Sequence, residues 1–285
     1  MGEAVRGDAI DRTAKLFIGG KQARADSGYS YAVLNPKGAA VGHAGLGNRK
    51  DIRNAVEAAS KASGWGAVSG HNRAQVLFYV AENLAARAGE FEARLRIMTG
   101  VTAAQAKAEV EAAIRRTFFY AGFADKYDGA VHTAKARHIT LAMNEPYGVM
   151  GVVCPPEAPL LALISLMMPA IAMGNRVVAT PSAAYPLCAT DFYQVLETSD
   201  VPAGVVNIVT GDSAELATTL AEHEGVDALW RAGDEAGAKR IEAASISNLK
   251  ATWTFAGARD WRQAQGREFL RRATQVKNIW APYGE

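Results

Sequence analysis

Two cysteines and five histidines are the side chains of this 285-residue sequence that most often carry out chemistry. A cysteine thiolate could attack a carbonyl carbon, but Cys154 ends an apolar strand and Cys188 lies early in a helix, where cysteine is usually a small buried hydrophobe. Two cysteines also exclude a disulfide framework and a four-thiolate zinc site. The histidines lack metal-ligand spacing, and we interpret each as an exposed loop or helix residue: His43, His71, His132, His138 and His223. We therefore predict no metal site.

Two acidic residues stand where helices are expected to begin. Glu157 precedes an apolar helix, and we interpret it as a solvent-facing residue near the helix start. Asp234 precedes another helix and is interpreted as its N-cap, which places a carboxylate where free N–H groups and the helix dipole attract anions. Arg231 could offset that charge by binding phosphate, an alternative that the sequence leaves open.

The first half of the chain is predicted to be mostly helical. Residues Lys15–Leu34 have the pattern of a hairpin, with Gly19-Gly20 as the turn signal. Asn48, with Asp51 three residues later, predicts the capped start of a helix that ends near residue 63. Three more helices are expected, which end before Gly89, before Gly100 and near Tyr127.

After Gly129 the spacing of apolar residues changes from a helical to a strand-like pattern. Strands are expected at 138–144 and 149–154, and helices and strands alternate from there. The further elements are helix 158–173, strand 176–179, helix 187–198, strand 205–209, helix 214–222, strand 226–230, helix 235–246 and strand 251–255. Five core strands with intervening helices predict a doubly wound parallel sheet with right-handed crossovers. A charged helix from about Asp260 to Arg272 and a last strand, Thr274–Trp280, are expected to follow.

Charge and composition exclude several classes of partner. Lysine and arginine number 31 against 29 acidic residues, so the formal charge of +2 favours neither nucleic acid nor an acidic membrane. The longest apolar stretch, 158–173, is shorter than the roughly 20 residues that span a bilayer. The polar segment 2–15 does not have the pattern of a secretion signal. We therefore expect a cytoplasmic protein without a membrane or nucleic-acid partner.

Several short segments occur in an order that resembles the aldehyde dehydrogenase superfamily. They are 16–20 (LFIGG), 120–122 (YAG), 145–149 (EPYGV), 174–175 (GN), 180–182 (TPS), 201–207 (VPAGVVN) and 247–250 (SNLK). Each segment alone is a weak signal, but their common order is specific. The resemblance implies a Rossmann-like coenzyme-binding domain and a β-flap that joins subunits.

The resemblance also implies catalytic positions, and this sequence departs from each of them. The nucleophile of the family lies in a catalytic domain that is expected after the strand ending near Phe255, but only a short segment separates that strand from the last one. The amide that stabilises the oxyanion corresponds to Glu157, which offers only acceptors when ionised. The family's carboxylate base corresponds to Phe255, which we interpret as a core aromatic that fills the space left. The resemblance therefore implies no catalytic residue.

The coenzyme positions depart from the family in the same way. The lysine and glutamate that hold the adenosine ribose correspond to Thr180 and Ala183. The segment that meets the pyrophosphate reads Arg231-Ala232-Gly233-Asp234, in which Gly233 alone is retained. We therefore predict no cofactor-binding residue, with NAD as the weaker alternative.

The combination of a retained scaffold and lost functional positions is similar to the truncated second module of the bidomain aldehyde dehydrogenases, the sixteenth family of that superfamily. In those proteins a complete catalytic module precedes a shortened one. The resemblance implies the following domains: a coenzyme-domain-like α/β core at 15–129 and 146–259 with the first hairpin 15–34 included, β-flap oligomerisation strands at 130–145 and 274–285, and a short linker helix at 260–273 in place of the catalytic domain.

Three functional hypotheses follow. The first is a pseudoenzyme that assembles with itself or with a catalytic aldehyde dehydrogenase module through its C-terminal strand. The second is the residual NAD-binding half of a split aldehyde dehydrogenase. The third is an unrelated enzyme that uses Glu157, Asp234 or a histidine.

Overall fold

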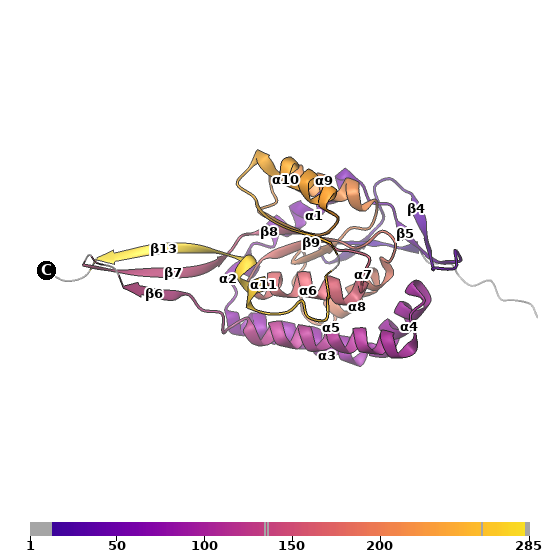
Figure 1. The fold of residues 1–285 in the computed structure, drawn as a ribbon, viewed down its shortest axis with the longest axis horizontal. Helices are drawn as coiled ribbons and strands as arrows, with labels where there is room; N and C mark the ends of the chain where they lie inside the picture. The colour runs from indigo at the N-terminus through magenta and orange to yellow at the C-terminus, as the bar shows by residue number, and fades with distance from the viewer. Residues whose placement is uncertain (1–12, 134, 136, 258, 283–285) are drawn as a thin grey trace, which may run out of the picture.

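The computed structural model describes residues 13–282 except 134, 136 and 258. The parts of the predicted segments that fall on residues 2–12, 134, 136, 258 and 283–285 lie outside the described residues. Figure 1 shows a body of helices around a central sheet, from which a narrow flap of strands projects. Within the described part of the chain, no helix is both long and apolar enough to cross a membrane.

The central sheet confirms the predicted doubly wound parallel arrangement. Its five parallel strands are β8 (Val149–Val153), β9 (Arg176–Thr180), β10 (Val206–Ile208), β11 (Ala228–Gly233) and β12 (Ala251–Ala256). They stand in the order β12-β11-β8-β9-β10, and the short strands β2 (Leu16–Ile18) and β3 (Lys21–Ala23) extend the sheet in antiparallel fashion. Every residue of β8 is buried, as expected for a strand covered on both faces.

Helices cover both faces of this sheet. One face carries α1 (Arg49–Lys61), α9 (Ser213–Glu222) and α10 (Glu235–Ala244). The other carries α6 (Pro159–Ala172), which is buried throughout because α3 (Gly70–Ala86) and α5 (Ala103–Phe123) pack outside it. A hydrophobic core lies on each face of the sheet. Successive residues of a strand point into alternate cores: Val152 packs on the α6 side and Val153 on the α1 side.

Most predicted helices are present with small shifts at their ends. The predicted helix at 187–198 is two short helices, α7 (Leu187–Asp191) and α8 (Tyr193–Glu197), separated by Phe192, whose backbone is itself helical. Helix α4 (Ala88–Thr99) ends at Gly100, which adopts the left-handed conformation that glycine tolerates best. A single 3₁₀ turn (Ser245–Ser247) follows α10.

The predicted hairpin at 15–34 is wrong in its pairing. Gly19 and Gly20, both with positive φ, join β2 to β3 in a tight hairpin of the central sheet. Strand β4 (Ser30–Leu34) instead pairs with β5 (Ala40–Gly45) in a separate small sheet that also contains β1 (Thr13–Ala14). The glycine-rich sequence of β5 lacks the alternation that marks a strand, so the true partner of β4 was not predicted.

The predicted charged helix from Asp260 to Arg272 is shorter than expected. Only α11 (Arg267–Arg272) is helical. Gly266 has a φ of 138°, which interrupts the helix, and the Asp260 carboxylate accepts the N–H of Arg262 in a local turn.

The flap is a three-stranded antiparallel sheet in the order β13-β7-β6. Its strands are β6 (Ala130–Thr133), β7 (His138–Pro146) and β13 (Thr274–Pro282). Strand β13 pairs with β7 along its whole length, from Thr274 opposite Pro146 to Pro282 opposite His138. The expected last strand is therefore present, and one of its two edges is hydrogen-bonded to β7 of the same chain.

Candidate functional site

The strand order defines where a ligand would be expected to bind. The chain passes from β8 to β9 and β10 on one side, then returns to β11 and β12 on the other side of β8. In such sheets, ligands bind outside the carboxyl ends of the strands at this reversal. The residues that follow β8 and β11 therefore form the candidate site, and the segment after β12 lies next to them.

Asp234 caps helix α10 at the end of β11. Its Oδ1 accepts the N–H of Gly237 at 2.7 Å, and its Oδ2 lies 2.7 Å from Nη2 of Arg231. The hydrogen bond from Gly237 and then the bond from Arg231 lower the pKa of Asp234 to about 2. The carboxylate is therefore ionised at neutral pH and holds the helix N-terminus, which confirms the predicted N-cap.

The guanidinium of Arg231 fills the space that two glycines leave open at the same place. A Cβ atom on Gly237 would overlap Nη2 of Arg231, and one on Gly233 would lie 2.8 Å from it. Arg231 is 9% exposed, and its Nη1 also donates to the carbonyl of Asp234 at 2.9 Å. The N–H of Gly237 and both terminal nitrogens of Arg231 are thus engaged within the chain itself.

The start of helix α6, after β8, is occupied in a similar way by a residue that the sequence analysis missed. Oε1 of Glu109, on α5, accepts the N–H groups of Leu160 at 3.0 Å and Leu161 at 3.3 Å. Burial raises the pKa of Glu109, and these two hydrogen bonds oppose that effect. Glu157 is exposed near the helix start, as predicted. No local signal marks Glu109, because its partners lie more than 50 residues further along the chain.

Neither thiol is placed for nucleophilic attack. Cys154 is 4% exposed and Cys188 is fully buried. Burial raises the pKa of Cys154 to about 12 and also raises that of Cys188. Both thiols are therefore protonated at neutral pH, and their prediction as small buried hydrophobes is confirmed.

Aromatic rings from β12 and from the segment after it cluster at the edge of the sheet. The centroid of Phe255 lies 4.6 Å from that of Trp253 and 6.3 Å from that of Trp261, and the guanidinium carbon of Arg259 lies 5.0 Å from the Phe255 ring centroid. Phe255 is half-buried and packs against the main hydrophobic core, so it is a core aromatic as expected, at the margin of the core and within an aromatic cluster.

Arg116 fixes this segment to the helices beneath it. It is 2% exposed on α5, and its guanidinium donates to the carbonyls of Trp261 at 2.6 Å and Arg262 at 3.0 Å, and to the hydroxyl of Ser165. This contact was not predicted from the sequence either, since Arg116 lies 145 residues from Trp261.

The positions that correspond to the ribose ligands carry no charge. Thr180 is fully buried and donates from Oγ1 to the carbonyl of Val152 at 3.4 Å. The backbone N–H of Ala183 donates to the hydroxyl of Ser213 at 3.2 Å. Neither residue offers the long polar group that would reach a ribose.

The histidines are not gathered into a metal site. Among the described residues, no three histidine, cysteine, aspartate or glutamate side chains form a group that could hold a metal ion. The expectation of loop or helix positions is wrong for three of them, since His43, His132 and His138 lie in strands. His223, half-buried after α9, accepts the N–H of Gly225 through Nδ1 at 3.0 Å.

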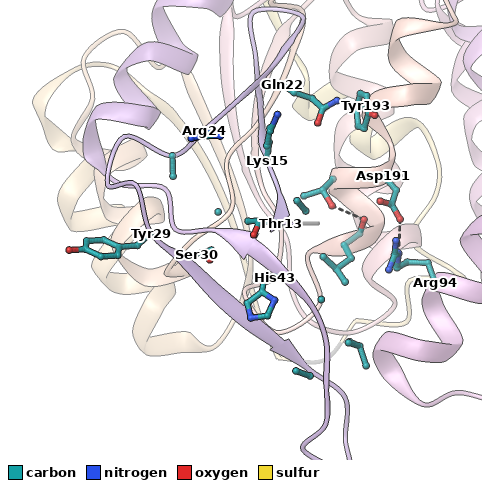
Figure 2. Close-up of a pocket in the computed structure, with 18 of the residues that line it drawn as sticks. Thr13, Lys15, Gln22, Arg24, Tyr29, Ser30, His43, Arg94, Asp191 and Tyr193 are labelled. Atoms are coloured by element: carbon teal, nitrogen blue, oxygen red, sulfur yellow. Dashed lines mark hydrogen bonds and ion pairs between the residues drawn. The ribbon is translucent and has the colours of Figure 1, made fainter. Parts of the chain in front are cut away.

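A large polar cleft lies elsewhere, between the small sheet and helices α7 and α8. It has a volume of about 1260 Å³, and Figure 2 shows His43 and Lys15 on one wall and Asp191 bound to Arg94 on the other. Nε of Arg94 lies 2.6 Å from Oδ2 of Asp191. The cleft is lined by strands β1, β3, β4 and β5, so it is separate from the ends of β8 and β11.

Sheet order, helix layers and the reversal beside β8 define a doubly wound α/β domain of the dinucleotide-binding type. The aldehyde dehydrogenase family model matches residues 21–260, and the chain therefore belongs to the aldehyde dehydrogenase family.

Individual relatives agree with this assignment. The chain is 30% identical over 258 residues to the cytosolic 10-formyltetrahydrofolate dehydrogenase of Mus musculus, which covers 87% of this chain and 29% of that protein. It is 33% identical over 241 residues to an aldehyde dehydrogenase of Agaricus bisporus, with 82% and 48% covered. The solved NAD-dependent aldehyde dehydrogenase of Sinorhizobium meliloti superposes with a TM-score of 0.83 at 27% identity, over 87% of this chain and 50% of that one. The chain thus spans half or less of the length of these relatives.

Proposed function

We propose that this chain is a noncatalytic aldehyde-dehydrogenase-like domain that serves assembly, with another copy of itself or with an active aldehyde dehydrogenase module. The observation that carries the proposal is the occupation of the candidate site by the chain's own groups. Asp234 and Arg231 fill the start of α10, and Glu109 fills the start of α6. An incoming pyrophosphate would have to displace these bonded groups and would also meet two carboxylates.

The loss of catalytic positions supports the same proposal. Glu157 and Phe255 stand where the resemblance implies an oxyanion donor and a base, and both thiols are buried. Strands β12 and β13 are joined by a short segment whose helix α11 has six residues. We propose that this segment stands in place of a catalytic domain, as in a truncated second module of a bidomain aldehyde dehydrogenase.

The flap provides the surface for assembly. The pairing register places Ile279 opposite Leu141, and Leu141 opposite Val131, so that these apolar side chains form one row across the sheet. Val131 is 71% exposed and Ile279 is 36% exposed. The outer side of β13 pairs with no other described strand. A partner strand or sheet would satisfy this edge and cover the apolar row.

Light scattering on a sizing column tests the assembly role. Because both sites are exposed, Val131→Asp/Ile279→Asp should fold normally and lower the measured mass, or abolish co-elution with a catalytic partner. The matched control His132→Asp/Asn278→Asp adds charges to the opposite face of the same strands and should have a smaller effect. A wild-type chain that elutes as a monomer and binds no aldehyde dehydrogenase module would contradict the proposal.

A second candidate is the residual NAD-binding half of a split aldehyde dehydrogenase. Family membership and the retained doubly wound sheet favour it. Isothermal titration with NAD⁺ and NADP⁺ separates the two candidates, since micromolar binding of either would support the second and count against a site closed by Asp234 and Arg231.

A further inference from the structure

The positive charge of the chain is concentrated in the segment that joins β12 to β13. Residues 259–272 contain five arginines and two acidic residues, which gives this segment a formal charge of +3. The whole chain carries +2, so all the other residues together carry −1. A short segment therefore differs in sign from the rest of the molecule.

Three of these arginines line one cleft at the base of the flap. The cleft has a volume of about 460 Å³ and is lined by Tyr127, Asp128, Arg267, Glu268, Arg271 and Arg272. Asp128 precedes β6 by two residues, and Arg272 precedes β13 by two residues. The cleft is thus continuous with the flap strands to which we assign assembly.

Aromatic rings hold two of the arginines in place. The guanidinium carbon of Arg267 lies 5.6 Å from the centroid of the Tyr127 ring, and that of Arg272 lies 5.4 Å from the Trp253 ring. A guanidinium that stacks on a ring keeps its N–H donors free at its edges, where they can bind a carboxylate in bidentate fashion. Because these arginine side chains are already ordered, they lose less conformational entropy when a partner binds.

The arginines of the cleft lack carboxylate partners in the described part of the chain. Glu268 pairs with Arg259, at 3.6 Å, outside the cleft lining. Arg267, Arg271 and Arg272 are exposed and form no ion pair with a described residue, and Asp128 is the other carboxylate of the lining. With Glu268 balanced by Arg259, the cleft has a net charge of two positive units.

We propose that this arginine cleft binds an acidic segment of the assembly partner, whose side-chain carboxylates meet Arg267, Arg271 and Arg272. The partner's role rests on the proposed function, because the cleft adjoins the flap. A protein segment fits better than nucleic acid, since the unpaired Asp128 would repel a continuous phosphate backbone and the chain as a whole carries only +2. Carboxylates spaced along a peptide can avoid Asp128.

Fluorescence anisotropy with a fluorescein-labelled decaglutamate peptide tests the cleft on the full chain. Arg267→Gln/Arg271→Gln should weaken binding at least about tenfold. The matched control Arg49→Gln/Arg53→Gln removes the same charge from α1, where both arginines already pair with glutamates, and should weaken binding less than about twofold. The charge-conserving Arg267→Lys/Arg271→Lys should retain part of the affinity, which separates recognition from a folding defect.

Three results would overturn the inference. They are no binding of decaglutamate by the wild-type chain, equal weakening by the α1 control, and tighter binding of an oligonucleotide of matched charge. The flap variant Val131→Asp/Ile279→Asp should bind the peptide as the wild type does. If the wild-type chain assembles but does not bind the peptide, only the proposed role of the arginine cleft is contradicted. If it binds the peptide but does not assemble, the proposed assembly function is contradicted.

Discussion

Oδ2 of Asp234 lies 2.7 Å from Nη2 of Arg231, across the turn between β11 and α10. Aspartate and arginine here neutralise each other at the point of the doubly wound sheet where a ligand's phosphate would be expected. The helix N-terminus is consequently capped from within, and the space over Gly233 and Gly237 is filled by the arginine.

Replacing Asp234 should therefore reopen the site in part. Asp234→Ser keeps a side chain that can cap the helix but removes the negative charge and releases Arg231. We expect the affinity for NAD⁺, measured by isothermal titration, to rise at least about tenfold without turnover. Asp212→Ser, the same change at the N-cap of α9, is the control and should leave affinity unchanged. Equal affinities for Asp234→Ser and the wild type would show that charge at α10 does not exclude the coenzyme.

Glu109 should make stability depend on pH in a defined direction. Its pKa is raised in the folded state, so the folded chain binds this proton more tightly than the unfolded chain does, and lowering the pH through the folded pKa stabilises the fold. Glu109→Gln keeps an acceptor for Leu160 and Leu161 without the buried charge. It should resist urea at least as well as the wild type at pH 7, and the difference should shrink toward pH 4.

The alanine variant at the same position separates the hydrogen bonds from the charge. Glu109→Ala leaves two N–H groups at the start of α6 without their acceptor, and it should lower the free energy of unfolding by about 1 to 3 kcal/mol at pH 7. If Glu109→Gln and Glu109→Ala lower the free energy of unfolding equally in urea titrations, Glu109 does not stabilise the fold by capping α6.

Arg116 should control the exposure of the segment after β12 to protease. Arg116→Met leaves the carbonyls of Trp261 and Arg262 without their buried donor, which should cost on the order of 3 kcal/mol and loosen the segment. Limited trypsin digestion should then cut after Arg259 or Arg262 about tenfold faster. Arg115→Met is the control, because Arg115 is exposed and pairs with Glu111, on its own helix, at 3.7 Å. Equal cleavage rates for the two variants would show that Arg116 does not anchor this segment.

The two thiols should be inert in the native chain. Cys154 and Cys188 are buried and their pKa values are raised, so a thiol-specific disulfide reagent at pH 8 should label neither residue until denaturant is added. Rapid labelling of one thiol per native chain would identify an accessible thiolate and would reopen the question of a nucleophile.

Features with local causes were predictable from the sequence. Asn48 and Asp51 form a capping box three residues apart, and Asp234 accepts the N–H of Gly237 over the same spacing. Each cap is decided by residues within one turn of a helix. The continuous apolar strands of the central sheet were equally visible, because burial on both faces requires apolar residues at every position.

Features that depend on distant residues were not predictable in this way. The cap that Glu109 provides for α6 and the donors that Arg116 provides to Trp261 join parts of the chain that only the finished fold brings together. The pairing of β4 failed for the same reason, because Tyr31 lies opposite Ala44 in a strand whose own sequence gives little indication of a strand.

Aldehyde oxidation by the purified chain tests whether this domain is noncatalytic. Absorbance at 340 nm is followed with NAD⁺ or NADP⁺ and a panel of acetaldehyde, hexanal and benzaldehyde. We expect no rise above a heat-treated control, since both thiols are buried and Phe255 cannot act as a base. A coenzyme-dependent rise that scales with the concentration of the chain would contradict it.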